Sequence, residues 1–222
     1  MIKKVLIAED IDSVRTGIIA ILKDKFNFTI DHSNSCDNAY LKILRANQDK
    51  QPYDLIITDL YFKVDEFISQ KLITGEDLVK AAKKIQPSIK SIVYTVESRP
   101  LYLKKLKVDT QINGIVIKGH QSLIELCNAI IAIQDGTNYF TSEVEFILKN
   151  DSSETIKGYD IKILELLANG YTQQEISAYL KNQNIKPSSV SAIEKRIGEL
   201  KQTLSANNSI HMVAIAKDMN II

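Results

Sequence analysis

Residues 54–60 read Asp-Leu-Ile-Ile-Thr-Asp-Leu, an apolar run that ends in an acidic residue, Asp59. Residues 5–8 form a second apolar run, Val-Leu-Ile-Ala, which is followed at once by Glu9 and Asp10. A short stretch that is apolar at successive positions is typical of a strand buried on both faces of a parallel sheet. The two runs therefore predict an α/β fold with carboxylates directly behind its strands.

The same alternation of short apolar runs and helical patterns continues to about residue 135. Five strands, each followed by a helix, predict a five-stranded parallel, doubly wound sheet with right-handed crossovers and helices on both faces. In such a sheet the ligand site lies at the carboxyl ends of the strands. We expect strands at residues 4–8, 28–32, 55–58, 91–95 and 114–117, and helices at 13–25, 37–47, 76–85, 101–106 and 122–134.

Beyond residue 155 the apolar spacing is only helical, which predicts a small all-α domain. Its helices are expected at residues 159–168, 172–180, 188–204 and 209–218. Residues 141–155 are polar and acidic, show no clear strand and are expected to be a linker. The predicted organisation is therefore an α/β domain at 1–140, a linker at 141–155 and a helical domain at 156–222.

The composition restricts the class of protein. The 222 residues are 45% hydrophobic and 25% charged, which excludes a disordered, collagen-like or low-complexity chain. The net charge of +1 predicts no partner by itself. Two cysteines, Cys36 and Cys127, are too few for a disulfide scaffold and indicate free thiols in a reducing cytosol. Because no signal peptide and no apolar stretch of ~18–20 residues is present, we expect a cytoplasmic protein without a membrane partner.

Charged and hydroxyl side chains follow four of the predicted strands. Glu9, Asp10 and Asp59 would meet at one edge of the sheet, where their mutual repulsion requires a cation or a proton to offset it. Oxygen ligands of this kind favour Mg²⁺. Thr95 and Lys118 end or follow two further strands and add a hydroxyl and an ammonium group. The pattern predicts a site that holds a metal ion and a phosphoryl group on an aspartate.

These segments resemble the receiver domain of two-component response regulators, which has a flavodoxin-like fold. The resemblance covers about residues 1–135 and is carried by residues 5–10, 54–60, 92–95 and 114–118 in that order. It implies that Asp59 accepts a phosphoryl group from a histidine of a partner sensor kinase. It also implies roles for the other site residues: Glu9, Asp10, Asp59 and the backbone carbonyl of Tyr61 bind Mg²⁺, and Thr95 and Lys118 hold the phosphoryl oxygens.

Two features depart from the receiver pattern. Ile115 stands where the family has an aromatic residue that switches with the phosphoryl group, and strand alternation directs the alternative aromatic, Tyr94, elsewhere. The glycine that matches the family pattern, Gly75, lies sixteen residues after Asp59. Residues 64–71 are therefore an insertion, which loop-closure entropy tolerates. It could be a lid, a partner contact or a neutral surface loop.

The helical domain carries a second resemblance. Gly170 is placed to end one helix, and Thr172 with Glu175 forms a capping box that starts the next. Residues 163–177 resemble the LuxR/NarL-type helix-turn-helix. The resemblance implies that the helix at 188–204 is a recognition helix for the DNA major groove. The helix at 209–218 resembles the fourth helix of such modules, which supports dimers, although its apolar residues could equally form intramolecular core.

The predicted recognition helix has two faces. Val190, Ile193, Ile197, Leu200 and Leu204 recur at helical spacing and are expected to pack inward. The polar face and the turn before it supply hydroxyl and basic groups suited to phosphates and base edges. The residues expected to contact DNA are Thr172, Lys186, Ser188, Ser189, Ser191, Ala192, Lys195 and Arg196.

Together the two resemblances imply a response regulator, not an enzyme, whose phosphorylation favours a homodimer on a promoter site. A second hypothesis is a DNA-binding regulator whose atypical receiver dimerises without phosphorylation, which Ile115 and the insertion suggest. A third is a Mg²⁺-dependent hydrolase with an aspartyl nucleophile. Such enzymes use a second aspartate two residues after the nucleophile as acid–base, and Tyr61 occupies that position.

Overall fold

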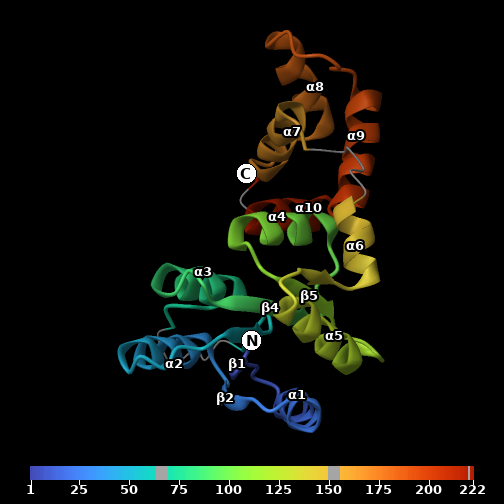
Figure 1. Cartoon of the computed structure of the whole chain (residues 1–222). Helices are drawn as coiled ribbons and strands as arrows, with labels where there is room; N and C mark the ends of the chain where they lie inside the picture. Colours follow the sequence, from blue (N-terminus) through green and yellow to red (C-terminus); the bar gives the residue numbers. More distant parts are fainter. Residues whose placement is uncertain (64–69, 150–155, 220) are drawn as a thin grey trace. The chain divides into compact units, whose positions relative to one another are not determined.

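The structure is a computed structural model that describes residues 1–63, 70–149, 156–219 and 221–222 (Figure 1). These residues form two compact units, the first made of Met1–Ser98 and Leu103–Leu148 and the second chiefly of Lys149–Ile222. No described helix is long and apolar enough to cross a lipid bilayer. Both cysteines are buried and unpaired.

The first unit is built on one parallel sheet with the strand order β2-β1-β3-β4-β5-β6. The parallel α/β class is therefore confirmed, but the sheet has six strands and not five. The sixth strand consists of two residues beside β5, too few to show a periodicity in the sequence. The bounds are β1 (Lys4–Ala8), β2 (Thr29–Ser33), β3 (Leu55–Thr58), β4 (Lys90–Thr95), β5 (Gly114–Ile117) and β6 (Tyr139–Phe140).

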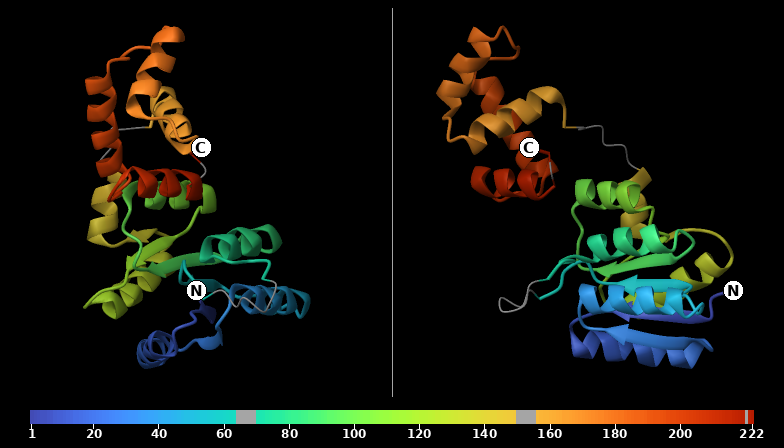
Figure 2. Two further views of the ribbon diagram at one scale, coloured as in Figure 1. Left: turned by 180° about the vertical axis from the view of Figure 1, so that it is seen from behind. Right: turned by 90° about the vertical axis from the view of Figure 1, so that its left-hand side faces the viewer.

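Helices cover both faces of this sheet (Figure 2). Ile18, Leu22 and Ile130 come from α1 and α5 and pack with the buried strand residues Val5 and Ile7 on one face. Helices α2 and α3 lie in contact with each other on the opposite side. The bounds are α1 (Asp12–Lys25), α2 (Cys36–Gln48), α3 (Gly75–Ile85), α4 (Pro100–Thr110) and α5 (Ser122–Gln134).

The segment expected to be a linker begins with a helix, α6 (Ser142–Lys149). Glu143 and Glu145 lie in its first turn, where carboxylates stabilise the positive end of the helix dipole, and Val144 is buried. The acidic composition that suggested a linker thus marks the start of a helix. Residues 150–155 of that segment lie outside the described residues.

The second unit contains α7 (Gly158–Ala168), α8 (Gln173–Asn182), α9 (Val190–Thr203) and α10 (Ser209–Asp218). Gly170 has φ +83°, the left-handed conformation expected after a helix end. Val190 was expected in the core, but it is the first residue of α9 and is exposed. The core of this unit includes Ile163, Leu164, Ile176, Leu180, Ile193, Ile197, Leu200, Leu204, Met212, Ile215 and Ala216.

Candidate functional site

Three carboxylates converge at the carboxyl ends of β1 and β3. Glu9 and Asp10 follow β1, Asp59 follows β3, and the two strands are neighbours with Ala8 paired to Thr58. One oxygen atom from each carboxylate lies within 4.8 Å of the others. Glu9 is 1% exposed and Asp59 is 7% exposed. The structure therefore brings together the three acids that the sequence placed at strand ends.

Lys118 completes this cluster from the end of β5. Its Nζ atom donates to Oε2 of Glu9 at 2.9 Å and also to Oδ2 of Asp59. Burial disfavours the ammonium form, but the hydrogen bonds and charges of Asp59 and Glu9 outweigh it and raise the pKa of Lys118. Lys118 is therefore an ammonium cation that bridges two carboxylates from different strands.

The charge of the cluster is not balanced. Burial raises the pKa of Glu9, and the nearby Asp59 carboxylate acts in the same direction, while Lys118 opposes both. Three carboxyl groups thus face one ammonium group in this cluster. Oxygen donors at this spacing suit a hard divalent cation such as Mg²⁺. The residues that could hold a cation here are Glu9, Asp10 and Asp59.

Backbone groups fix the orientation of the acids. Leu60 N–H donates to Oδ1 of Asp59 at 2.6 Å, so both oxygens of that carboxylate have a donor. Lys63 N–H donates to Asp10 at 2.9 Å and Ile11 N–H donates to Glu9 at 3.2 Å. These contacts hold the carboxylates in position without neutralising them.

A glycine allows close approach beside Asp59. A Cβ atom at Gly75 would lie 1.8 Å from the backbone oxygen of Asp59, and Gly75 N–H donates to the carbonyl of Leu60 at 2.9 Å. Tyr61 and Thr74 form an isolated antiparallel bridge just outside this contact. Backbone contacts therefore hold together the residues on either side of the insertion at 64–71. Its residues 64–69, on which its role as a lid depends, lie outside the described residues.

Thr95 is the last residue of β4 and is fully buried. Its hydroxyl accepts the backbone N–H of Glu97 at 3.1 Å. The carboxylate of Glu97 in turn accepts the phenol hydroxyl of Tyr61. The sequence did not single out Glu97, because a single acid in a loop has no periodicity or motif that marks it. It is nonetheless buried and joins the two predicted site residues Thr95 and Tyr61.

Tyr94 lies closer to the site than strand alternation suggested. It packs in the core shared with α1 and α5, but its ring centroid is 5.4 Å from Nζ of Lys118. Its hydroxyl is 2.6 Å from Oγ of Ser122, and Ser122 also donates to the carbonyl of Gly119 at 2.8 Å. Ile115, at the usual switch position, is fully buried. The aromatic ring beside Lys118 thus comes from β4 and not from β5.

In the second unit, several residues predicted to contact DNA shape the helix ends. Thr172 caps α8, where its hydroxyl and Glu175 form the predicted capping box. Ser189 caps α9 and accepts the N–H of Ala192 at 3.3 Å, with Ser191 beside it. The carbonyl of Ser188 accepts the hydroxyl of Ser177 at 2.6 Å.

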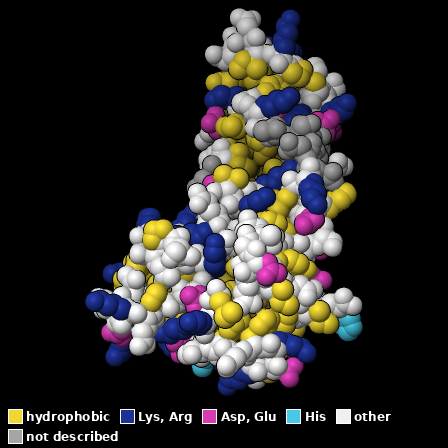
Figure 3. All heavy atoms as spheres, in the orientation of Figure 1, with side chains coloured by type: hydrophobic (Ala, Val, Ile, Leu, Met, Phe, Trp, Pro, Cys, Tyr) yellow, Lys and Arg dark blue, Asp and Glu magenta, His cyan; other side chains and the backbone are white. Residues whose placement is uncertain are grey.

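The basic residues of this unit fall into two groups. Lys186 is exposed, and the side chain of Lys195 is 81% exposed with only a 3.9 Å ion pair to Glu199. Arg196, also predicted to contact DNA, donates from Nε and a terminal nitrogen to Asp160 at 2.7 and 2.9 Å and also to Glu199. The sequence could not show this pairing, because Asp160 lies on another helix. Figure 3 shows Lys and Arg side chains scattered over the visible face.

No protein-family model matches the chain. The response regulator GacA of Pseudomonas aeruginosa is 26% identical over 226 residues, which cover 97% of each protein. The chain resembles two-component response regulators along its whole length. A structure of two RcsB dimers bound to two parallel DNAs has a TM-score of 0.72 at 25% identity and covers 98% of both chains. RcsB from Salmonella enterica serovar Typhimurium, bound to promoter P1flhDC with the phosphomimetic BeF3⁻, has a TM-score of 0.68 at 25% identity over 97% of this chain and 98% of that one.

Proposed function

We propose that this chain is a two-component response regulator: Asp59 accepts a phosphoryl group from a sensor histidine kinase, and the helical unit binds promoter DNA in the cytoplasm. The observation that carries the proposal is the meeting of Asp59, Glu9, Asp10 and Lys118 in one cluster. The full-length likeness to GacA and to DNA-bound RcsB supports the combination of the two units in one regulator.

The chemistry is a transfer from nitrogen to oxygen. A carboxylate oxygen of Asp59 attacks the phosphorus of a phosphohistidine, the P–O bond forms, and the P–N bond breaks with departure of the imidazole. Lys118 already contacts Oδ2 of Asp59, so its ammonium group is placed to stabilise the oxygens of the transferred group. Thr95 lies at the end of the neighbouring strand β4, and since its oxygen only accepts the N–H of Glu97, its O–H group could donate to a phosphoryl oxygen.

The residues present fit a divalent cation. We assign its ligands to Glu9, Asp10, Asp59 and the backbone carbonyl of Tyr61, and the three clustered carboxylates support this assignment. When bound, Mg²⁺ would neutralise charge on the transferring phosphoryl oxygens. Glu9 and Asp10 would hold the cation from the end of β1, while Lys118 bridges Glu9 and Asp59 from the end of β5.

For the DNA interface, we propose the N-terminal end of α9 and the turn before it. Lys186, Ser191 and Lys195 are exposed and are the best placed of the predicted contacts. Arg196 is assigned a structural role, because its guanidinium group is paired with the buried Asp160. A homodimer that presents two such helices would read two half-sites about one helical turn apart.

The test of the acceptor is covalent modification. The full-length protein is incubated with acetyl phosphate and Mg²⁺, and phosphorylation is followed by mass spectrometry or by gel retardation. Wild type should gain one phosphoryl group, whereas Asp59→Ala should gain none. Asp24→Asn, a change at an exposed acid of α1, is the matched control and should behave as wild type. Equal modification of Asp59→Ala would refute the assignment of the acceptor.

A regulator that binds DNA without phosphorylation is the alternative. The burial of the aliphatic Ile115 at the usual switch position favours it. It predicts that Asp59→Asn dimerises and binds a promoter fragment as wild type does, with or without acetyl phosphate. The primary proposal predicts that only phosphorylated wild type gains affinity. Hydrolytic turnover is not part of either function, since Tyr61 stands where an acid–base aspartate would be needed.

A further inference from the structure

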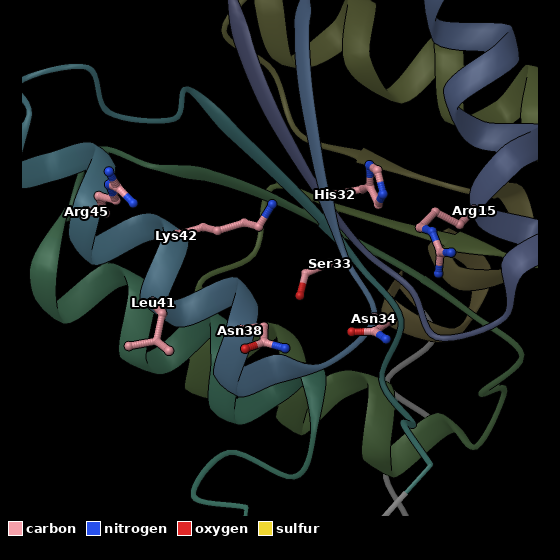
Figure 4. Close-up of a pocket in the computed structure, with 8 residues that line it drawn as sticks. All are labelled: Arg15, His32, Ser33, Asn34, Asn38, Leu41, Lys42 and Arg45. Carbon is pink, nitrogen blue, oxygen red and sulfur yellow. The ribbon is translucent and has the colours of Figure 1, made fainter.

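The outer edge of the sheet carries a second polar hollow, of about 460 Å³, away from the acid cluster (Figure 4). It wraps around the edge strand β2, with Arg15 of α1 on one side and Lys42 and Arg45 of α2 on the other. His32 of β2 lines it as well. None of the described residues that line this hollow is acidic. The hollow is thus a basic groove along an open strand edge.

The backbone of β2 is available in this groove. Strand β2 pairs only with β1, and Thr29 N–H and Ser33 C=O both bond toward β1. Because backbone groups alternate in direction along a parallel strand, the N–H and C=O groups of Ile30 and His32 face outward. No described residue pairs with those outward groups. An edge of this kind is a template for another extended chain.

The side chains around the edge set the chemistry of a partner. Lys42 has no ion-pair partner among the residues that the structure describes, and Arg45 has one exposed contact, to Asp49 at 3.8 Å. Arg15 pairs with the exposed Asp12, but its own side chain is only 16% exposed and also donates to the carbonyl of Glu9 at 2.9 Å, so it forms a wall of the groove and is not a free cation. The exposed Arg45–Asp49 pair contributes little and exchanges readily with other carboxylates. Leu41 on the groove wall is 59% exposed and adds one apolar contact.

We propose that this groove binds an acidic peptide segment of a partner protein, which adds to β2 as an extended strand. Main-chain hydrogen bonds to Ile30 and His32 would supply affinity, and alternate acidic side chains on one face of the added strand would meet Lys42 and Arg45 of α2. The proposal does not depend on phosphorylation of Asp59, because the groove shares no residue with the acid cluster.

The test uses a fluorescein-labelled hexapeptide of alternating Glu and Val and measures fluorescence anisotropy with the full-length protein. Wild type should bind it in preference to the same peptide with Lys in place of Glu. Lys42→Glu combined with Arg45→Glu should weaken binding about tenfold or more. Lys23→Glu, an exposed charge reversal on α1 outside the groove, is the matched control and should leave binding unchanged. Equal binding of both peptides, or no effect of the double variant, would overturn the proposal.

Strand addition is separated from simple anion binding by His32→Pro. The outward N–H of His32 makes no bond within the sheet, so proline at this edge position removes only the donor offered to the partner. Loss of peptide binding with an unchanged unfolding temperature supports strand addition, and retained binding overturns it. If the variant does not fold, hydrogen exchange of the His32 amide in wild type decides: protection by the peptide supports the proposal, and no protection overturns it. Displacement of the probe by a 20-base-pair DNA duplex, lost in the Lys42/Arg45 variant, would assign the groove to nucleic acid and overturn the proposal.

Discussion

Replacement of Lys118 by methionine is the sharpest test of the acid cluster. The change keeps an apolar stem of similar length and removes the one ammonium group that contacts both Glu9 and Asp59. At the 2.9 Å separation from Glu9, with an effective dielectric constant of about 20, the direct attraction is about 6 kcal/mol before desolvation is subtracted. Removal of one partner of a buried pair typically costs about 3–5 kcal/mol, because the other charge remains buried.

The expected loss lies at the lower end of that range, about 3 kcal/mol, because Glu9 can take up a proton once Lys118 is gone. The pKa of Glu9 is already raised by burial, and the loss of the ammonium group would raise it further. For a unit of this size, a loss of about 3 kcal/mol lowers the unfolding temperature by roughly 6–12 °C. Differential scanning calorimetry of the full-length protein in EDTA measures this change.

The same variant should accept a phosphoryl group slowly. A preorganised donor to a developing oxyanion contributes about 10²–10³ in rate, so phosphorylation by acetyl phosphate should fall by roughly 100-fold. Mg²⁺ should also protect the variant more than wild type against heat, since the cation would then offset charge that Lys118 otherwise balances. An unchanged phosphorylation rate, or an unchanged unfolding temperature in EDTA, would refute the role given to Lys118.

Three further changes have defined outcomes. Gly75→Ala places a Cβ against the backbone oxygen of Asp59 and should cost about 3 kcal/mol in the free energy of unfolding, whereas Gly17→Ala, whose nearest contact would be 3.8 Å away, should not destabilise. Tyr94→Phe removes the hydrogen bond to Ser122 and should lower the free energy of unfolding by about 1 kcal/mol. It keeps the ring beside Lys118, so phosphorylation should continue at a normal rate, whereas Tyr94→Leu removes the ring and should slow phosphorylation. Arg196→Met should destabilise the helical unit by about 3 kcal/mol at pH 7, as measured by urea unfolding.

The Arg196 change also has a pH signature. Burial opposes ionisation of Asp160, but its bonds to Arg196 outweigh burial, and the pKa of Asp160 lies below its ordinary value. Because the pKa of Asp160 is lower in the folded state, its ionised form stabilises the fold at pH values above the unfolded pKa of about 3.9. This stabilisation is lost as the pH falls toward the pKa of the folded state. The difference between wild type and Arg196→Met should therefore be full at neutral pH and shrink below about pH 4. A constant difference across that range would contradict the ion pair as its cause.

Much of the fold follows from local patterns. The runs 55–58 and 114–117 and the helix 122–134 have the bounds that apolar spacing predicted. The exceptions have local causes too. Helix α4 continues to Thr110, beyond the predicted end at 106. The prediction ended too early because residues 107–110 show no regular apolar spacing, and Val108 is 74% exposed. Strand β6 is too short to leave a periodic signal.

The sequence predicted those contacts of the candidate site that follow from the order and direction of the strands alone. Parallel strands bring their ends together, so residues directly after β1, β3 and β5 must share an edge, and Glu9, Asp59 and Lys118 do. Contacts that depend on loop conformation were not accessible, such as the buried Glu97 between Thr95 and Tyr61. Nor could helical spacing show that Arg196 turns inward, because its partner is fixed by the packing of α7 against α9.

The hydrogen bonds that Asp59 accepts indicate which contacts its proposed phosphorylation would alter. Each oxygen of its carboxylate has a donor, Leu60 N–H on one and Lys118 on the other, so an added phosphoryl group has to displace at least one of them. The backbone donor is fixed by the turn after β3, whereas the ammonium group of Lys118 ends a flexible stem. If Asp59 is the acceptor, we therefore expect Lys118 to move with the phosphoryl oxygens. Its ammonium group lies over the ring of Tyr94, and the Tyr94 hydroxyl is hydrogen-bonded to Ser122 at the start of α5. We therefore expect that movement to reach the β5–α5 loop through Tyr94, without an aromatic residue at position 115.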